Sequence, residues 1–183
     1  MSAPSDDLLM RQVRGGDASR LGVLFERHQA ALYGFYLRLT GDRQAGEDLV
    51  QEVFFRMLKY RHTYRDDSQF TTWMYHIARH VQADWFRKRR LEVGVADEEW
   101  NRMPGREQPG METRQEAALV RQALARLPED KREVLVLSRF QDLKYDQIAE
   151  LLDCEVGAVK VRVHRALRAL REIYGELAGR KAS

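Results

Sequence analysis

The chain has 183 residues, of which 44% are hydrophobic and 32% are charged. At roughly 100–200 residues per domain, this length fits one domain or two small ones with buried cores. The longest apolar run, residues 134–137, is far shorter than the ~18 residues that a membrane span needs. The start of the chain is acidic and polar, unlike a signal peptide. We therefore expect no stable membrane insertion and a cytoplasmic location.

Cysteine content and net charge narrow the function classes further. The single cysteine, Cys154, excludes an internal disulfide framework and a multi-cysteine zinc site. The net charge of +3 is too small to indicate a partner, so only the distribution of charge along the chain is informative.

A stretch without helical periodicity divides the chain into two blocks. Residues 92–112 contain Pro104, Pro109, three glycines and an acidic run at 97–99, a composition typical of a flexible linker. On both sides of it, apolar residues recur at spacings of three and four, and we find no alternating run bounded by turns. We predict an all-α protein of two small helical domains. Its segments are a tail over 1–18, a domain over 19–90, an acidic flexible linker over 91–115 and a helix-turn-helix domain over 116–178.

The acidic side of the helix expected around residues 45–58 is a candidate protein-binding surface. The apolar residues Leu49, Val53 and Met57 predict its inner face, and its outer face carries Asp48, Gln51, Glu52 and Arg56. An ordinary solvated face is the alternative.

The helix expected over residues 70–90 combines an apolar stripe with a basic and aromatic surface. Its outer side is expected to carry Thr72, Tyr75, His76, Arg79, His80 and Arg87. Aromatic and cationic side chains together suit single-stranded DNA, because bases stack while cations follow the phosphates. The alternative is that the aromatic residues belong to the core and that the basic run 87–90 is a solvated helix end.

A zinc-protease site at His76 and His80 is disfavoured. That chemistry needs a Glu directly after the first His as general base, and residue 77 is Ile. We therefore predict no metal and no catalytic residue at this helix.

Residues 145–166 have the pattern of a helix-turn-helix. A short helix with the small Ala149 at its crossing point is followed by a tight turn at 153–155 and a second helix that packs through Val159 and Val163. The exposed side of the second helix carries Lys160, Arg162, His164, Arg165, Arg168 and Arg171. A basic helix of this kind fits the major groove of DNA, and the alternative is a solvated helix that only packs on its partner.

Taken together, these stretches resemble the extracytoplasmic-function (ECF) sigma factors, the small two-domain sigma subunits of bacterial RNA polymerase. The matching stretches are 45–58, 70–79 with the basic residues that follow, and 127–137 leading into the helix-turn-helix. They occur in the family's order over residues 19–173, with a linker between them.

The resemblance implies a sigma factor that directs core RNA polymerase to specific promoters and assists DNA melting, with no catalytic residue, metal or cofactor of its own. Its partners would be core RNA polymerase, promoter DNA and an anti-sigma factor. The implied polymerase contacts are Asp48, Gln51, Glu52 and Arg56. The implied contacts to the −10 element and its unpaired strand are Tyr64, Ser68, Gln69, Phe70, His76, Arg79, His80 and Arg87. The implied contacts to the −35 element are Lys160, Val161, Arg162, His164, Arg165 and Arg168.

Several positions depart from the family pattern. His80 stands where Asn is common, Ala158 and Val161 replace hydroxyl residues, Asp153 occupies a usual Gly site, and Lys144 occupies a usual hydroxyl cap. The promoter sequence therefore does not follow from the resemblance. The alternatives are a stand-alone DNA-binding regulator and, less favoured because of Ile77, a metal-dependent hydrolase.

Overall fold

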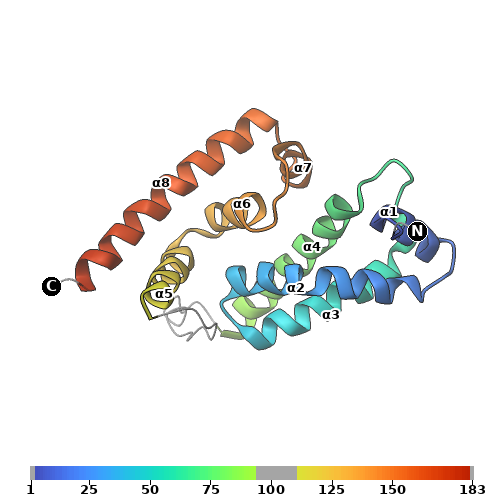
Figure 1. The fold of residues 1–183 in the computed structure, drawn as a ribbon, viewed down its shortest axis with the longest axis horizontal. Coiled ribbons are helices and arrows are strands. Elements are labelled where there is room, and N and C mark those ends of the chain that lie inside the picture. The colour runs from blue at the N-terminus through green and yellow to red at the C-terminus, as the bar shows by residue number, and fades with distance from the viewer. Residues whose placement is uncertain (1–2, 94–110, 182–183) are drawn as a thin grey trace. The chain divides into compact units, whose positions relative to one another are not determined.

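A computed structural model describes residues 3–93 and 111–181 and contains only helices and their connections in these ranges (Figure 1). The helices are α1 (Asp6–Arg14), α2 (Arg20–Thr40), α3 (Arg43–Lys59), the 3₁₀ helix η1 (Arg61–Thr63), α4 (Phe70–Val93), α5 (Met111–Arg126), α6 (Glu129–Arg139), α7 (Tyr145–Leu151) and α8 (Val156–Lys181). The all-α prediction is confirmed.

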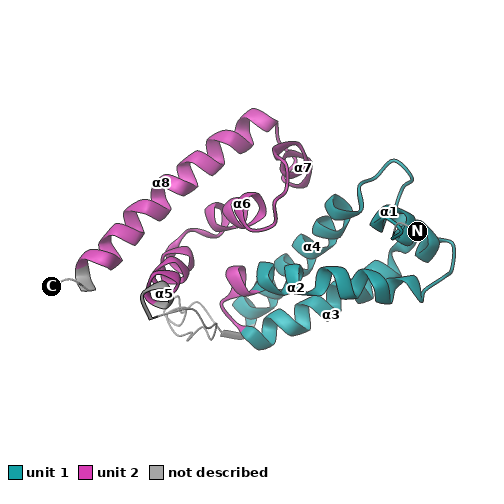
Figure 2. Cartoon of the chain, in the orientation of Figure 1, with its two compact units in different colours: residues 1–36, 43–95 teal, residues 37–42, 96–183 magenta. Residues whose placement is uncertain are grey.

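The chain forms two compact units (Figure 2). One comprises residues 1–36 and 43–95, and the other comprises residues 37–42 and 96–183. Much of the linker predicted over 91–115 lies outside the described residues, since α4 continues to Val93 and α5 begins at Met111.

The core of the N-terminal unit is built largely from α2, α3 and α4. Tyr36 donates its hydroxyl hydrogen to the carbonyl of Ala78 at 3.0 Å, and the Phe35 ring meets the Tyr75 ring edge-on at 5.3 Å. The buried apolar side chains include Leu24, Leu32, Phe35, Leu49, Val53, Met57, Met74, Ala78 and Val81. The apolar stripe predicted for residues 45–58 therefore faces this core.

Residues 6–14 form helix α1, within the segment 1–18 for which the sequence predicted a tail. Ser5 caps this helix by accepting a hydrogen bond from the backbone N–H of Leu8. Acidic residues in the first turn and basic residues in the last turn favour a helix through its dipole. Leu9, Met10 and Val13 share one face and are almost completely buried. Burial of this short apolar face holds the segment against the domain.

The core of the C-terminal unit is formed by α5, α6, α7 and α8. Val134, Leu135, Val136 and Leu137 of α6 are buried together with Ile148, Val159 and Val163. Further along α8, Leu177 packs with Leu119 and Ala123 of α5, and the half-buried Leu170, Ile173 and Tyr174 cover this cluster. Helix α8 thus carries a helix-turn-helix half and a half that packs on α5.

Arg132 joins the beginning of α6 to the end of α5. Its side chain is buried, with 6% of the residue exposed. Its guanidinium group donates to the carbonyl oxygens of Leu124, Ala125 and Leu127 at 2.7–2.8 Å. Burial lowers the pKa of Arg132. A cation at the carboxyl end of a helix is favourable, because the last carbonyl groups have no partner inside the helix.

Candidate nucleic-acid interface

The connection between α7 and α8 is a tight turn whose backbone bonds hold the two helices together. The backbone N–H of Cys154 donates to the carbonyl of Ala149 at 3.0 Å, and that of Asp153 donates to Glu150 at 3.3 Å. Asp153 has a φ of 48°, in the left-handed region that favours glycine. The helix-turn-helix predicted from the sequence therefore forms, with Asp at the usual Gly position.

Buried valines determine which side of α8 faces outward. Val159 and Val163 are 0% and 2% exposed and anchor the helix in the core of its unit. All six residues predicted to contact the −35 element are exposed on α8: Lys160, Val161, Arg162, His164, Arg165 and Arg168. Cationic side chains on such a face can reach phosphates and base edges, and an exposed apolar side chain such as Val161 can contact a thymine methyl group.

The end of α3, η1 and α4 line an open hollow of about 450 Å³ in the N-terminal unit. Its lining residues are Arg56, Tyr60, Thr63, Trp73, His76, Ile77, His80 and Asp84. Trp73 is half-buried, and its indole N–H donates to the hydroxyl of Thr63 at 3.3 Å. The hollow thus combines aromatic faces and histidine side chains with the ion pair of Arg56 and Asp84. Aromatic faces beside polar groups suit a nucleobase.

The polar residues predicted for the −10 element differ in their exposure. Gln69, His80 and Arg87 are exposed, whereas Ser68, His76 and Arg79 are half-buried. Arg87 also pairs with Asp84 on its own helix, at 2.6 Å between Nη2 and Oδ1.

Tyr64 and Phe70 lie in the core, which differs from the base-contacting role that the resemblance implied. They are 1% and 2% exposed, and Phe70 packs against the ring of His28 at 5.0 Å between centroids. Burial raises the pKa of Tyr64, and its hydrogen bond to Asp7 raises it further. Neither ring is available for stacking on a base in this structure.

Thr72 and Tyr75 are also buried, although the sequence pattern placed them on the outer side of the helix. The reason is that α4 is covered over a wider arc than a single stripe. Tyr75 packs against Phe35 of α2, and α4 also contacts both α1 and α3. Burial raises the pKa of Tyr75 as well.

The residues predicted to bind polymerase divide into two kinds on α3. Asp48 and Gln51 are exposed, whereas Glu52 and Arg56 are half-buried and pair with each other at 2.6 Å. Arg56 also pairs with Asp84 of α4 at 2.8 Å between Nη1 and Oδ2. Arg56 is therefore engaged within the domain.

Phe55, which the sequence analysis missed, is the largest apolar side chain near this surface. It is 61% exposed and lies one helical turn after Gln51. An exposed aromatic residue beside a polar face is typical of protein-binding sites. Its place next to the buried Phe54 could have indicated that only one of the two rings fits the core.

Within the described residues, no group of three or more His, Cys, Asp or Glu side chains is arranged to hold a metal ion. None of the helices in the described parts of the chain is long and apolar enough to span a membrane.

Comparison with known proteins identifies both units. The family model for sigma-70 region 2 matches residues 24–92, and the model for sigma-70 region 4 matches residues 117–170. The RNA polymerase sigma-H factor of Pseudomonas aeruginosa is 31% identical over 181 residues, which cover 93% of this chain and 94% of the relative. The ECF RNA polymerase sigma factor SigX of Bacillus subtilis is 33% identical over 159 residues, which cover 82% of this chain and 81% of the relative.

A solved structure of a sigma factor has the same fold. The sigma factor RpoE from Bartonella quintana, crystallised with the anti-sigma factor NepR, matches with a TM-score of 0.70 and 26% identity, over 83% of this chain and 94% of that chain. The chain therefore belongs to the sigma-70 family, among its ECF members, and is a DNA-binding initiation factor for promoter-specific transcription by RNA polymerase.

Proposed function

We propose that the two units divide promoter recognition between them. The helix-turn-helix reads the −35 element as duplex DNA, and the N-terminal unit binds core polymerase and the −10 element. The observation that carries this proposal is the exposed basic face of α8, opposite the buried anchors Val159 and Val163.

In the −35 complex, α8 would lie in the major groove. Arg165 and Lys160 would contact base edges or phosphates, and Val161 would add an apolar contact at a position where the family pattern has a hydroxyl residue. This difference favours a base that offers a methyl group at that position.

In the −10 complex, the hollow beside α4 would hold a base of the unpaired non-template strand. Trp73 supports this role because its ring is half-exposed, and His76 and His80 supply polar contacts beside it. Ser68 and Gln69 from the preceding loop and Arg79 and Arg87 from α4 would contact neighbouring nucleotides. A base held in a protein pocket offsets lost stacking and pairing, which assists melting without ATP.

Core polymerase would bind the surface of α3 that carries Asp48, Gln51 and Glu52. We add Phe55 as its apolar contact, because an aromatic side chain that becomes buried contributes more to affinity than a solvated rim charge. We assign Arg56 to bracing α3 against α4 rather than to polymerase binding, since it already pairs with Glu52 and Asp84.

The protein would act in the cytoplasm, where its polymerase and promoters are, and would contribute no catalytic group or cofactor. We also propose that an anti-sigma factor holds it inactive. The similarity to RpoE, whose structure contains the anti-sigma factor NepR, supports this partner.

Transcription of fragmented genomic DNA by purified core polymerase, with and without the protein, tests the proposal. New RNA 5′ ends that share two spaced upstream elements are expected. If the protein binds duplex DNA alone and no start depends on it, a stand-alone regulator is the better description.

Substitutions separate the polymerase surface from the DNA surfaces. The triple change Asp48→Ala, Gln51→Ala and Phe55→Ser should reduce co-elution with core polymerase, while Glu26→Ala, at an exposed position of α2, is the matched control. If the triple variant co-elutes with core polymerase as the unchanged protein does, this surface is an ordinary solvated face and does not bind polymerase.

A further inference from the structure

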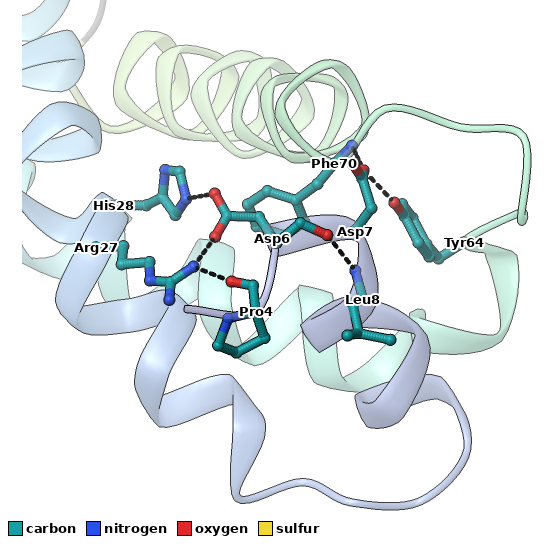
Figure 3. A network of polar contacts seen from close by, with 9 residues as sticks. Pro4, Asp6, Asp7, Leu8, Arg27, His28, Tyr64 and Phe70 are labelled. Atoms are coloured by element: carbon teal, nitrogen blue, oxygen red, sulfur yellow. Dashed lines mark hydrogen bonds and ion pairs between the residues drawn. The ribbon is translucent and has the colours of Figure 1, made fainter. Parts of the chain in front are cut away.

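Helix α1 lies before the segment that matches the region 2 family model, yet it bonds to the connection between η1 and α4 (Figure 3). This connection, residues 64–69, contains Ser68 and Gln69, to which we assign −10 contacts. The bonds involve residues of the first and the last turn of α1.

Asp7, in the first turn, holds two groups at once. Its Oδ1 atom accepts from the backbone N–H of Phe70 at 2.7 Å and from the hydroxyl of Tyr64 at 2.8 Å. Phe70 is the first residue of α4, so Asp7 caps that helix from a different helix and places a negative charge at its amino end. The same carboxylate therefore ties the start of the 64–69 connection to its end.

Arg14, in the last turn, holds the same connection from the other end of α1. Its Nη1 donates to the carbonyl of Tyr64 at 2.8 Å, and its Nη2 pairs with Asp66 at 2.6 Å. Tyr64 is thus bonded through its side chain to Asp7 and through its backbone to Arg14.

Helix α1 is itself fixed to α2. Asp6 pairs with Arg27 at 2.6 Å and with His28 at 2.7 Å, and Arg27 also donates to the carbonyl of Pro4 at 2.9 Å. Figure 3 shows both side chains of α2 reaching towards Asp6 while Asp7 reaches the opposite way, towards Tyr64 and Phe70. The connection is therefore held against a long helix of the domain rather than against a loose segment.

We propose that α1 positions residues 64–69 for binding of the −10 strand, with Asp7 as the main positioning residue and Arg14 as its support. The proposal rests on the proposed role of Ser68 and Gln69. Because α1 already orders this connection before DNA binds, less conformational entropy is lost when the complex forms. Without Asp7, polymerase would still bind, and the −10 strand would bind more weakly.

The test uses full-length protein in complex with core polymerase and a promoter fragment mapped as above, whose −10 non-template strand is left unpaired. Asp7→Ala is expected to weaken binding of this DNA about tenfold, as for one hydrogen bond to a charged group. Asp7→Asn should recover part of the loss, since Asn keeps an oxygen that accepts from the same N–H but lacks the negative charge at the amino end of α4. Arg11→Ala, at an exposed position of the same helix, is the matched control.

Measuring affinity for core polymerase distinguishes a loss of positioning of residues 64–69 from a general loss of structure in the variant. Asp7→Ala should co-elute with core polymerase as the unchanged protein does, and equal losses in both assays would overturn the proposal. If Asp7→Ala fails to fold, Tyr64→Phe takes its place, because it keeps the ring and removes only the bonds of the hydroxyl, which donates to Asp7 at 2.8 Å and lies 3.1 Å from the carbonyl oxygen of Ser68. It should weaken −10 binding about twofold to threefold, and an unchanged affinity would overturn the proposal.

The double variant Ser68→Ala, Gln69→Ala distinguishes the two proposals. If it binds the DNA normally, the −10 role of the connection is wrong. If it binds weakly while Asp7→Ala binds normally, the −10 role stands and the positioning role of α1 is wrong.

Discussion

Arg56 of α3 contacts Asp84 of α4 at 2.8 Å between Nη1 and Oδ2, and its Nε pairs with Glu52 at 2.6 Å. Burial alone would lower the pKa of Arg56, but the hydrogen bonds to Glu52 and Asp84 outweigh this effect and raise it. The surface that we assign to polymerase and the helix that we assign to the −10 element are thus joined by one guanidinium group.

A double-mutant cycle with Arg56→Met and Asp84→Asn should give a coupling free energy of about 0.5–1 kcal/mol. Urea unfolding followed by tryptophan fluorescence measures it, since Trp73 and Trp85 are both on α4. The matched control is the pair Arg65 and Asp67, whose side chains are 77% and 74% exposed and should show no measurable coupling. Equal coupling in the two cycles would contradict a structural role for Arg56.

The contribution of Asp84 should depend on pH. The hydrogen bond from Arg56 lowers the pKa of Asp84, so the unfolded chain binds a proton more readily than the folded one. This stabilisation is complete above the unfolded-state pKa of about 3.9 and is lost as the pH falls through the lower folded-state pKa. The difference in urea midpoint between the unchanged protein and Asp84→Asn should therefore shrink below pH ~4. A difference that stays constant from neutral to acidic pH would rule out this linkage.

Arg132→Met should destabilise the C-terminal unit by about 3 kcal/mol, because buried carbonyl groups of α5 lose their donor. The stability of Arg132→Lys should lie between that of the unchanged protein and that of Arg132→Met, since an ammonium group keeps the charge but cannot reproduce the planar set of donors. Thermal unfolding followed by circular dichroism measures both. Arg126→Met, at an exposed position of α5, should have little effect, and a similar loss there would argue against a specific role for Arg132.

Asp153→Gly should stabilise the helix-turn-helix by about 0.5–1 kcal/mol, because glycine adopts the φ of 48° without steric cost. Asp153→Val should destabilise it by about 1–2 kcal/mol, since a β-branched residue is strained in this region. Chemical unfolding gives both values. Equal stability of the two variants would show that the turn does not hold this conformation in solution.

Arg165→Ala should weaken binding of the −35 duplex by about 1–3 kcal/mol if it contacts a base edge, with polymerase co-elution unchanged. If Arg165 instead contacts a phosphate, the substitution should weaken binding to all DNA sequences alike and reduce the slope of log affinity against log salt concentration by about one. Arg121→Ala, at an exposed position of α5, is the control for loss of positive charge. Normal promoter affinity of Arg165→Ala would exclude this residue from the interface.

Helical periodicity predicted the fold class and the outward side of α8. The spacing of Val159 and Val163 places both side chains on one face of a helix, whatever the rest of the chain does. Periodicity was less informative for α4, where contacts with three other helices bury Thr72 and Tyr75 as well as the expected stripe. An apolar stripe in the sequence predicts the smallest part of a helix surface that is buried. It does not predict how many other helices pack against that helix.

The contacts that escaped the sequence analysis join residues far apart in the chain. Tyr64 bonds to Asp7 across 57 positions, and Arg56 bonds to Asp84 across 28. A single sequence carries no local signal for such pairs, so it could not predict that Tyr64 is buried or that Arg56 pairs with Asp84 inside the domain. The capping signal of Ser5 with the apolar residues of α1 was local and could have been recognised.

The division of α8 into buried anchors and an exposed basic face has an evolutionary consequence. Exposed substitutions usually change folding stability by no more than about 0.5 kcal/mol. Lys160, Val161 and Arg165 can therefore be exchanged with little effect on the fold, while Val159 and Val163 keep the helix in place. With the −35 role that we propose for this face, duplicated copies of such a gene can acquire new promoter preferences by a few surface changes, without first gaining stability elsewhere.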